Sequence, residues 1–316
     1  MSAVLDPATG ALLAQMREGG GKPLYEMAVD EVRAMVTGSS EMLAGTPVEV
    51  GSVADRTIQA GGHSIPLRIY TPSGDQHGVL PIVVYFHGGG FVAGSLDTHA
   101  PAARYLCQNA NAIVVAVGYR KAPEHRFPAA VDDAVAATEW AATNAAAIGG
   151  DARRLAVAGD SAGGNLATVV CQLAKVRGGP HIAFQALFYP LVDNTLADSP
   201  SRSLYGGGDF FLSNPDMEWF RAHYLADPSQ SADPRVSPLL APDVSGLPPA
   251  LIIAAGCDPL LDEGRAYADR LSAAGVPVEY RCFNGTIHAF MSFCGAIPMG
   301  REALAFAASR IRSALS

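Results

Sequence analysis

The sequence predicts an α/β fold whose central sheet is mostly parallel and is covered by helices on both faces. Short runs rich in β-branched residues alternate along the chain with segments of helical pattern, as in strands joined by helical crossovers. The predicted strands are continuous apolar runs, as residues 81–86 (PIVVYF) illustrate. Strands of that kind are buried on both faces, which is typical of a parallel sheet.

Seven strands are expected from these runs. They span residues 66–70, 81–86, 112–117, 155–158, 184–189, 250–255 and 277–283.

Three helices are expected between these strands. The first begins at Pro128, because a proline without an N–H group suits the first helical position. The second covers residues 165–176 and ends before Gly178. The third covers residues 262–274 and is closed by Gly275, since glycine readily adopts the left-handed conformation that ends helices.

Two regions interrupt the alternation of strands and helices. Residues 1–50 have a helical pattern and precede the first strand, while residues 195–235 are loops rich in Pro, Gly and Ser around a helical segment at 215–225. We expect both regions to cover the sheet as a helical cap. Residues 51–316 then form one α/β domain that carries the second region as an insertion.

The composition excludes some classes of partner. The 316 residues carry a formal charge of −8, and only 16% of them are charged. A protein that binds nucleic acid normally needs a clustered basic face, so small molecules are the expected partners. No apolar run is long enough to span a membrane, and the first twenty residues do not have the pattern of a signal peptide. The five cysteines are scattered without a CxxC motif, which favours reduced thiols and a cytoplasmic location.

The motif GDSAGG at residues 159–164 follows one predicted strand and precedes a predicted helix. A serine between small residues at a strand-to-helix turn is typical of a nucleophile, and the helix N-terminus offers N–H groups to a developing negative charge. Ser161 is therefore the candidate nucleophile. The alternative is a glycine-rich turn or phosphate cradle in which Ser161 has no role.

A second motif, HGGGF at residues 87–91, lies at the end of another buried strand. Three consecutive glycines let the backbone approach a ligand closely and direct several N–H groups toward one point. An oxyanion hole requires such amides, and Ala162, directly after the serine, offers one more. His87 is expected to hold this loop by hydrogen bonds, and the alternative is that the loop is merely flexible.

A serine nucleophile needs a general base and a carboxylate that orients the base. Of the eight histidines, only His288 lies after the last predicted strand, at the edge where open α/β sheets gather their sites. Asp258 follows the strand at residues 250–255 and is the preferred carboxylate. Asp193, which follows the preceding strand, is the alternative.

Five motifs carry a resemblance to a known family. They are HGGGF at 87–91, YRKAPEHRFPAAVDD at 119–133, GDSAGGN at 159–165, DPLLDEG at 258–264 and HAF at 288–290. Together they resemble the hormone-sensitive-lipase group of α/β-hydrolase esterases, over about residues 65–315. Lys121 stands where that family usually has an apolar residue.

The resemblance implies a role for each candidate residue. Ser161 corresponds to the nucleophile, Asp258 to the acid and His288 to the base, and the oxyanion donors correspond to Gly89, Gly90 and Ala162. It further implies that the α/β-hydrolase domain hydrolyses short to medium acyl esters beneath the cap, and that two copies of the chain form a homodimer.

The motifs are also compatible with activities other than ester hydrolysis. The same residues could cleave an amide or a lactone, and the fold also occurs in ligand receptors without catalysis. No His, Cys or Asp cluster has metal-ligand spacing, and the glycine runs lack a ribose-binding acid, so no metal or cofactor is expected. The aromatic residues of the predicted cap could line an acyl pocket or simply pack the cap; they are Phe210, Phe211, Trp219, Phe220 and Tyr224.

Overall fold

The fold is built on one eight-stranded sheet, seen in a computed structural model that describes residues 4–74 and 78–316. The strand order is β1-β2-β4-β3-β5-β6-β7-β8. The first two pairings, β1 with β2 and β2 with β4, are antiparallel, and all the others are parallel. The strands span β1 Ser52–Ala60, β2 His63–Thr71, β3 Leu80–Phe86, β4 Ile113–Val117, β5 Gly150–Asp160, β6 Phe184–Phe188, β7 Ala250–Cys257 and β8 Val278–Ile287.

All seven predicted strands are present, so the mostly parallel sheet is confirmed. Their ends differ from the prediction, most of all in β5, which begins at Gly150 because a polar extension continues the pairing with β3. The eighth strand, β1, was not predicted. It is polar and almost wholly exposed, with only Ile58 buried, so its sequence lacks the apolar run that marks a strand.

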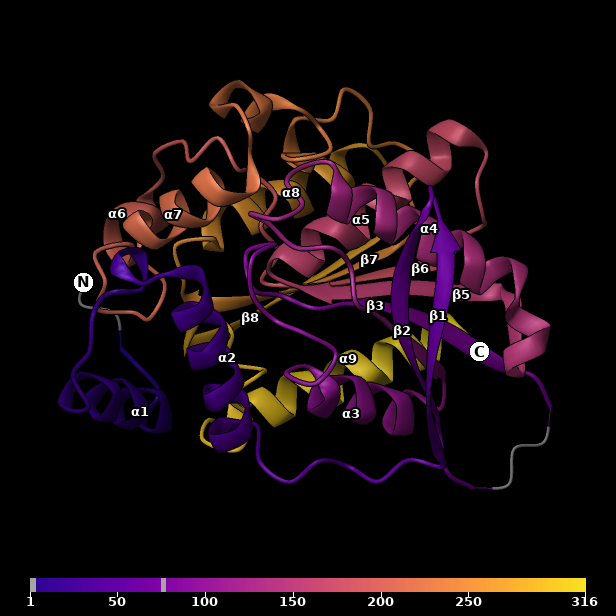
Figure 1. Ribbon diagram of the computed structural model, residues 1–316, viewed down its shortest axis with the longest axis horizontal. Helices are drawn as coiled ribbons and strands as arrows, with labels where there is room; N and C mark the ends of the chain where they lie inside the picture. Colours follow the sequence, from indigo (N-terminus) through magenta and orange to yellow (C-terminus); the bar gives the residue numbers. More distant parts are fainter. Residues whose placement is uncertain (1–3, 75–77) are drawn as a thin grey trace.

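Helices cover both faces of the sheet (Figure 1). The helices α4 (Ala129–Thr143), α5 (Ala162–Arg177) and α8 (Leu261–Ala273) pack on one face, and α3 (Ala100–Ala110) and α9 (Pro298–Ala314) pack on the other. The sequence did not predict α3 or α9. One predicted helix start was wrong, because Pro128 caps α4 with non-helical backbone angles and Ala129 is the first helical residue.

The central strand β3 shows why the sheet needs cover on both sides. All seven of its residues are buried. Ile82, Val84 and Phe86 belong to the apolar cluster under α4, α5 and α8, whereas Val83 and Tyr85 belong to the cluster under α3 and α9. Burying such side chains contributes roughly 1.5–3 kcal/mol each, which makes the parallel strands the rigid part of the fold.

Helices from the two predicted cap regions lie together at one end of the sheet (Figure 1). They are α1 (Pro7–Glu18), α2 (Val29–Leu43), α6 (Pro200–Tyr205) and α7 (Asn214–Tyr224). Short 3₁₀ turns complete the chain at Leu24–Glu26, Ala145–Ile148, Pro228–Ala232 and Pro238–Leu240. We call α2, α6 and α7 the cap helices. The division into a cap and a catalytic domain stays a prediction.

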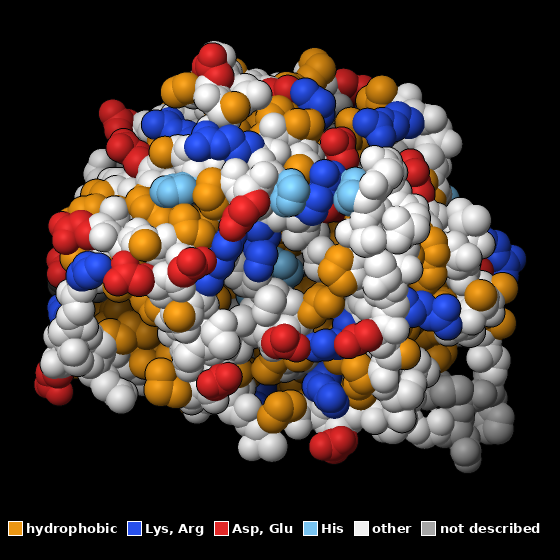
Figure 2. Space-filling model, viewed as in Figure 1, with side chains coloured by type: hydrophobic (Ala, Val, Ile, Leu, Met, Phe, Trp, Pro, Cys, Tyr) orange, Lys and Arg blue, Asp and Glu red, His pale blue; other side chains and the backbone are white. Residues whose placement is uncertain are grey.

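The surface mixes both signs of charge on the face shown in Figure 2, where basic and acidic side chains lie next to one another. None of the helices in the described ranges has the length and apolar character needed to cross a membrane.

Candidate active site

Ser161 lies at the turn between β5 and α5, as its motif predicts. Its backbone has φ 53° and ψ −117°, and a non-glycine residue in such a conformation stores roughly 1–3 kcal/mol of strain. Three backbone hydrogen bonds hold it there: Ser161 N donates to Phe188 O (2.9 Å), and Ser161 O accepts from Asn165 N (3.1 Å) and from Leu191 N (3.2 Å). The strained turn presents the hydroxyl at the carboxyl ends of the strands.

His288 and Asp258 come to this hydroxyl from the ends of two neighbouring strands. His288 directly follows β8, and Asp258 directly follows β7. The Nε2 atom of His288 lies 2.9 Å from Ser161 Oγ, and its Nδ1 atom lies 2.7 Å from Asp258 Oδ2. Through this chain of hydrogen bonds, the imidazole can accept the proton of the serine.

Asp258 is held on both oxygens of its carboxylate. Its side chain is buried, with 1% of the residue exposed, and its Oδ1 atom accepts a hydrogen bond from Leu260 N (2.9 Å). Asp193, the alternative carboxylate, instead accepts from Thr195 N (2.9 Å). The structure thus places Asp258, and not Asp193, beside the imidazole of His288.

The glycine loop, which we define as residues 87–94, lies beside the Ser161 turn. A Cβ atom added to Gly163 would lie only 2.7 Å from His87 O, so the loop and the turn are in direct contact. The amides of Gly89, Gly90 and Ala162 donate no hydrogen bond to any residue in the described part of the chain. They are available to an anionic oxygen of a ligand.

Gly89 cannot be replaced without changing the loop. Its φ is +111°, and an added Cβ would collide with the carbonyl of Ala93. That carbonyl belongs to the turn in which Val92 N and Ala93 N donate to Gly89 O (3.0 and 2.8 Å). Only glycine combines this backbone angle with so close an approach.

A buried polar network supports the glycine loop through Asp160. Its Oδ1 atom accepts from Gly88 N (3.0 Å) and from the Tyr85 hydroxyl (2.7 Å), and its Oδ2 atom lies 3.3 Å from His99 Nε2. Burial raises the pKa of Asp160, but His99 and Tyr85 outweigh burial and keep that pKa below its ordinary value. Asp160 is therefore an ionised anchor for the loop.

His87 also anchors the loop and is not placed to act as a base. Its Nδ1 atom lies 2.7 Å from Gly88 O, and the Tyr119 hydroxyl donates to His87 O (2.7 Å). Burial lowers the pKa of His87 to about 3. The ring thus stays neutral, and this agrees with the scaffold role expected from the sequence.

The predicted cap aromatics divide between the site and the packing of the cap. Phe220 of α7 lies so close to Gly90 that an added Cβ would collide with its ring. Tyr224, one turn further along α7, instead stacks on Phe91, with 3.9 Å between ring centroids. Phe211 is 36% exposed and packs edge-on against Phe293. Of these residues, Phe220 is the one placed to limit the space above the glycine loop.

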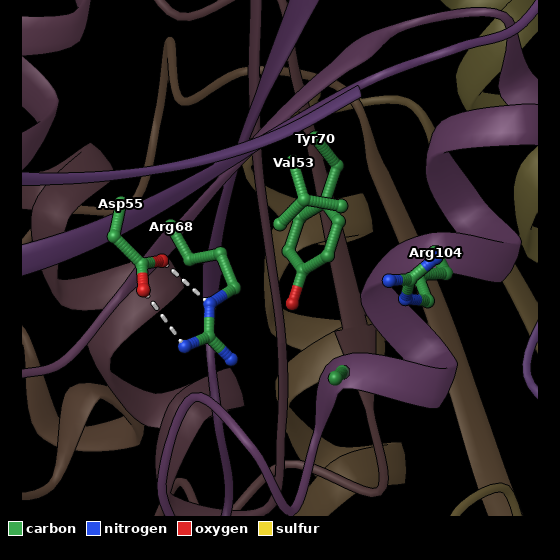
Figure 3. A pocket seen from close by; sticks show the side chains of 6 residues that line it. Val53, Asp55, Arg68, Tyr70 and Arg104 are labelled. Atoms are coloured by element: carbon green, nitrogen blue, oxygen red, sulfur yellow. Dashed lines mark hydrogen bonds and ion pairs between the residues drawn. The ribbon is translucent and has the colours of Figure 1, made fainter. Parts of the chain in front are cut away.

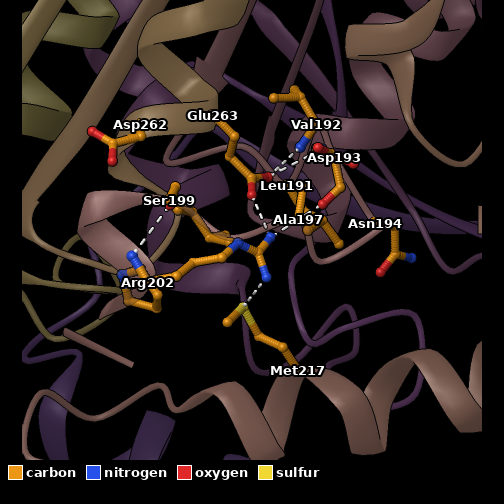
Figure 4. A network of polar contacts seen from close by, with 12 residues as sticks. Leu191, Val192, Asp193, Asn194, Ala197, Ser199, Arg202, Met217, Asp262 and Glu263 are labelled. Atoms are coloured by element: carbon orange, nitrogen blue, oxygen red, sulfur yellow. Dashed lines mark hydrogen bonds and ion pairs between the residues drawn. The ribbon is translucent and has the colours of Figure 1, made fainter. Parts of the chain in front are cut away.

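A buried ion pair joins the cap helix α6 to the segment that carries Asp258 (Figure 4). Arg202 donates to Glu263 Oε2 (2.6 Å) and to Asp193 O (3.2 Å). The other carboxylate oxygen, Oε1, accepts from Val192 N (2.8 Å). Next to this pair, Ser201 Oγ donates to Pro259 O (2.9 Å). The start of the insertion is thereby fixed to the residues that follow Asp258.

Neither Arg202 nor Glu263 was predicted from the sequence. Glu263 lies within the DPLLDEG motif, on the buried side of α8. A charged residue among the apolar positions of a predicted helix is a sequence signal for a buried ion pair. Arg202 lies in a polar segment where nothing marks one arginine as buried.

A surface hollow of about 270 Å³ lies away from this site, between β1, β2 and α3 (Figure 3). Its charged lining is largely paired internally, since Arg68 binds Asp55 (2.6 Å) and Asp97 (2.6 Å). Among the described residues, no group of three or more His, Cys, Asp or Glu side chains could hold a metal ion.

A family model described as "alpha/beta hydrolase fold" matches residues 83–292. The chain belongs to the α/β-hydrolase family. This α/β-hydrolase is similar to the carboxylic ester hydrolase LipN of Mycobacterium tuberculosis, at 44% identity over 91% of this chain and 77% of LipN. It is also similar to an ethyl acetate hydrolase of Pseudomonas putida, at 40% identity over 95% of this chain and 96% of that protein.

Solved structures agree with this assignment. The hyperthermophilic esterase of Pyrobaculum calidifontis superposes on this α/β-hydrolase with a TM-score of 0.93, at 42% identity, covering 99% of this chain and 100% of that one. An ester hydrolase from the metagenome of Lake Arreo gives a TM-score of 0.94 at 42% identity, over 98% and 99% of the two chains. The predicted fold and the resemblance to the esterases are confirmed.

The ion pair of Arg202 and Glu263 gives a prediction about stability. Replacing Arg202 by Met leaves a buried carboxylate without its partner, which we expect to lower the free energy of unfolding by about 3–5 kcal/mol at pH 8. Burial raises the pKa of Glu263 to about 7. The variant can therefore neutralise Glu263 by protonation in acid, and the loss should be much smaller at pH 5.

Urea unfolding at both pH values measures this difference. In the double variant R202M/E263Q, the carboxylate is gone while the acceptor for Val192 N remains, so most of the loss at pH 8 should be recovered. Equal losses at the two pH values would contradict the prediction.

Proposed function

We propose that this α/β-hydrolase is a serine carboxylesterase that hydrolyses short to medium acyl esters. The observation that carries the proposal is the hydrogen-bonded chain of Ser161, His288 and Asp258 beside the free amides of the glycine loop. The names of the similar proteins, carboxylic ester hydrolase and ethyl acetate hydrolase, support the choice of esters as substrates.

The proposed reaction begins with attack of Ser161 Oγ on the ester carbonyl, while His288 takes the serine proton. Asp258 holds the imidazole in the tautomer that presents Nε2 to the serine and stabilises the imidazolium that forms. The tetrahedral intermediate collapses to an acyl-enzyme, and the alcohol leaves with the proton from His288. Water then attacks the acyl-enzyme with His288 again as base, and the carboxylic acid is released.

The amides of Gly89, Gly90 and Ala162 are proposed to stabilise the oxyanion of each tetrahedral intermediate. Backbone donors of this kind are fixed before the reaction, so they do not have to reorganise as charge develops on the oxygen. In a well-studied protease, one such donor contributes roughly 2.7–4 kcal/mol. The helix N-terminus at Ala162 adds a favourable dipole at the same place.

The resemblance also predicts a homodimer formed through the last strand and helix. β8 lies at the edge of the sheet, and no second strand of the described chain pairs with its outer side. Its half-exposed segment places Glu279 and Arg281 on either side of Tyr280. An antiparallel copy related by a two-fold axis at Tyr280 sets Glu279 opposite Arg281, and opposite charges in that position are favourable.

The cytoplasmic location of the protein stays a prediction from the sequence.

The nucleophile is tested with S161A. We expect turnover of p-nitrophenyl butyrate to fall by roughly 10⁴-fold or more, because removal of a member of such a triad has effects of that size. A fluorophosphonate should label the wild type and not the variant. Turnover or labelling of S161A at the wild-type level would exclude Ser161 as the nucleophile.

The base is tested by the pH dependence of kcat/KM between pH 4 and 9. We expect the rate to fall on acidification, since a protonated His288 cannot accept the serine proton. His87 has a pKa of about 3, so it stays neutral over this range and cannot cause the fall. Burial raises the pKa of Glu263 to about 7. The double variant R202M/E263Q, which leaves no unpaired buried charge, therefore serves as the control that must keep the acidic limb. A flat profile down to pH 4 would rule out His288.

The limit on acyl length is tested with F220A. Phe220 closes the space over Gly90, so removing its ring should raise kcat/KM for an octanoate ester relative to a butyrate ester by about tenfold. The matched control is F211A, because that ring packs edge-on against Phe293. An unchanged ratio in F220A, or an equal change in F211A, would argue against this wall of the pocket.

A further inference from the structure

The glycine loop uses its amides for the site, so its carbonyl groups must find hydrogen-bond donors elsewhere. Four of these eight carbonyls face neutral groups of the surrounding fold. His87 O accepts from the Tyr119 hydroxyl, Gly88 O lies beside the His87 imidazole, Gly89 O accepts from the turn amides, and Phe91 O accepts from Ala122 N (2.9 Å).

Two carbonyls of the loop bind cationic side chains instead. Val92 O accepts from Arg33 Nε (3.0 Å), and Gly94 O accepts from Lys121 Nζ (2.6 Å). Hydrogen bonds from charged donors are shorter and roughly twice as strong as neutral ones. The last turn of the loop is therefore held by two charge-assisted bonds from different parts of the chain.

Arg33 is itself held in place by further contacts. It comes from the cap helix α2, and its terminal nitrogens donate to Ala122 O (3.0 Å) and to both carboxylate oxygens of Glu124 (2.7 Å each). The planar guanidinium thus connects α2, the glycine loop and the segment after β4 in a single geometry. Only 25% of the Arg33 side chain is exposed.

Lys121 reaches the loop from that same segment. It is half-buried, and partial burial together with the nearby charge of Arg33 lowers its pKa. An apolar side chain, which the resemblance leads one to expect at this position, offers no donor to Gly94 O. The usual residue of that family would therefore not make the contact that Lys121 makes.

Gly94, whose carbonyl Lys121 binds, packs against the peptide group that carries the Gly89 amide. Gly94 packs so tightly that an added Cβ would collide with Gly88 O and lie 2.6 Å from His87 Nδ1. In the same way, Gly89 rests against the carbonyl of Ala93. Residues 92–94 form the floor on which the peptide groups at Gly88 and Gly89 lie, so a displacement of the floor tilts the amides above it.

We propose that Lys121 and Arg33 are positioning residues for the oxyanion hole. By binding Gly94 O and Val92 O they fix the floor of the glycine loop, which keeps the amides of Gly89 and Gly90 aimed at one point. This inference rests on the proposed esterase function. Neither side chain contacts the substrate; both act through the loop, and Arg33 makes a cap helix part of the support.

The experiment compares K121M, which removes the donor, with K121R, which keeps it. Oxyanion donors act more strongly on the transition state than on the bound ester, so their misplacement should lower kcat and leave KM nearly unchanged. We expect kcat for p-nitrophenyl butyrate to fall about tenfold in K121M, less than the loss of a whole donor. K121R should keep at least about half of the wild-type kcat.

The matched control is K175M. Lys175 also places its ammonium group 2.6 Å from a single oxygen, that of Asp243, but it lies near the far end of α5. Its removal should leave kcat unchanged. R33M, a change in a different element of the fold, provides a second test and should lower kcat in the same way even if K121M does not fold.

A reversible trifluoromethyl ketone separates a positioning role from a merely structural one. Ser161 adds to its carbonyl carbon, the carbonyl electron pair moves to the oxygen, and His288 takes the proton, so the product is a hemiketal oxyanion. Its inhibition constant should rise by the factor by which kcat falls. An unchanged inhibition constant, or a loss of activity that appears in KM, would overturn the proposal.

Labelling of Ser161 with a fluorophosphonate to completion keeps this test distinct from the proposed function. If the wild type is not labelled at Ser161, the esterase proposal itself fails. The extent of labelling also counts the active sites in each preparation. If all variants are labelled fully, and kcat calculated per active site is unchanged in both K121M and R33M, the positioning role alone is refuted.

Discussion

The constraint on which the rest of the site depends is the strained backbone of Ser161. A positive φ at a serine persists only where the surroundings hold it, and here the end of β6 and the loop after it supply the hydrogen bonds that do so. The rigid parallel strands on either side make that support possible. Because β5 lies between β3 and β6 in the sheet, the turn meets the glycine loop on one side and the β6 loop on the other.

The parallel arrangement also brings the remaining groups to the same edge. β3 ends in the glycine loop, β7 in Asp258 and β8 in His288, and all three strands run in the direction of β5. Residues up to 200 positions apart in the sequence therefore converge without any long side chain. Short, buried side chains lose little freedom when they are held in place, which favours the preorganised geometry that the proposed chemistry requires.

The parts of the fold and of the site that could be predicted are those that leave a local signal in the sequence. The buried strands and the motifs around Ser161, Asp258 and His288 could be predicted, because apolar runs and glycine turns are local signals. Helix α9 was missed, although its inner face is apolar and Pro298 begins it with a start signal of the kind used at Pro128. The ion pair of Arg202 with Glu263 and the contact of Phe220 with Gly90 could not be predicted, since each joins residues that only the folded cap brings together.

The polar character of β1 affects the tendency of the protein to aggregate at high concentration. A strand at the edge of a sheet presents unpaired backbone groups to which the edge of another molecule can add. Along β1, exposed Asp55 and Arg56 stand where an apolar edge would carry valine or isoleucine, and Arg68 of β2 pairs with Asp55 beside them. Charged side chains there disfavour the addition of a second sheet. The polar sequence of β1, which lacks the apolar pattern of a buried strand, thus also protects the protein from edge-to-edge aggregation.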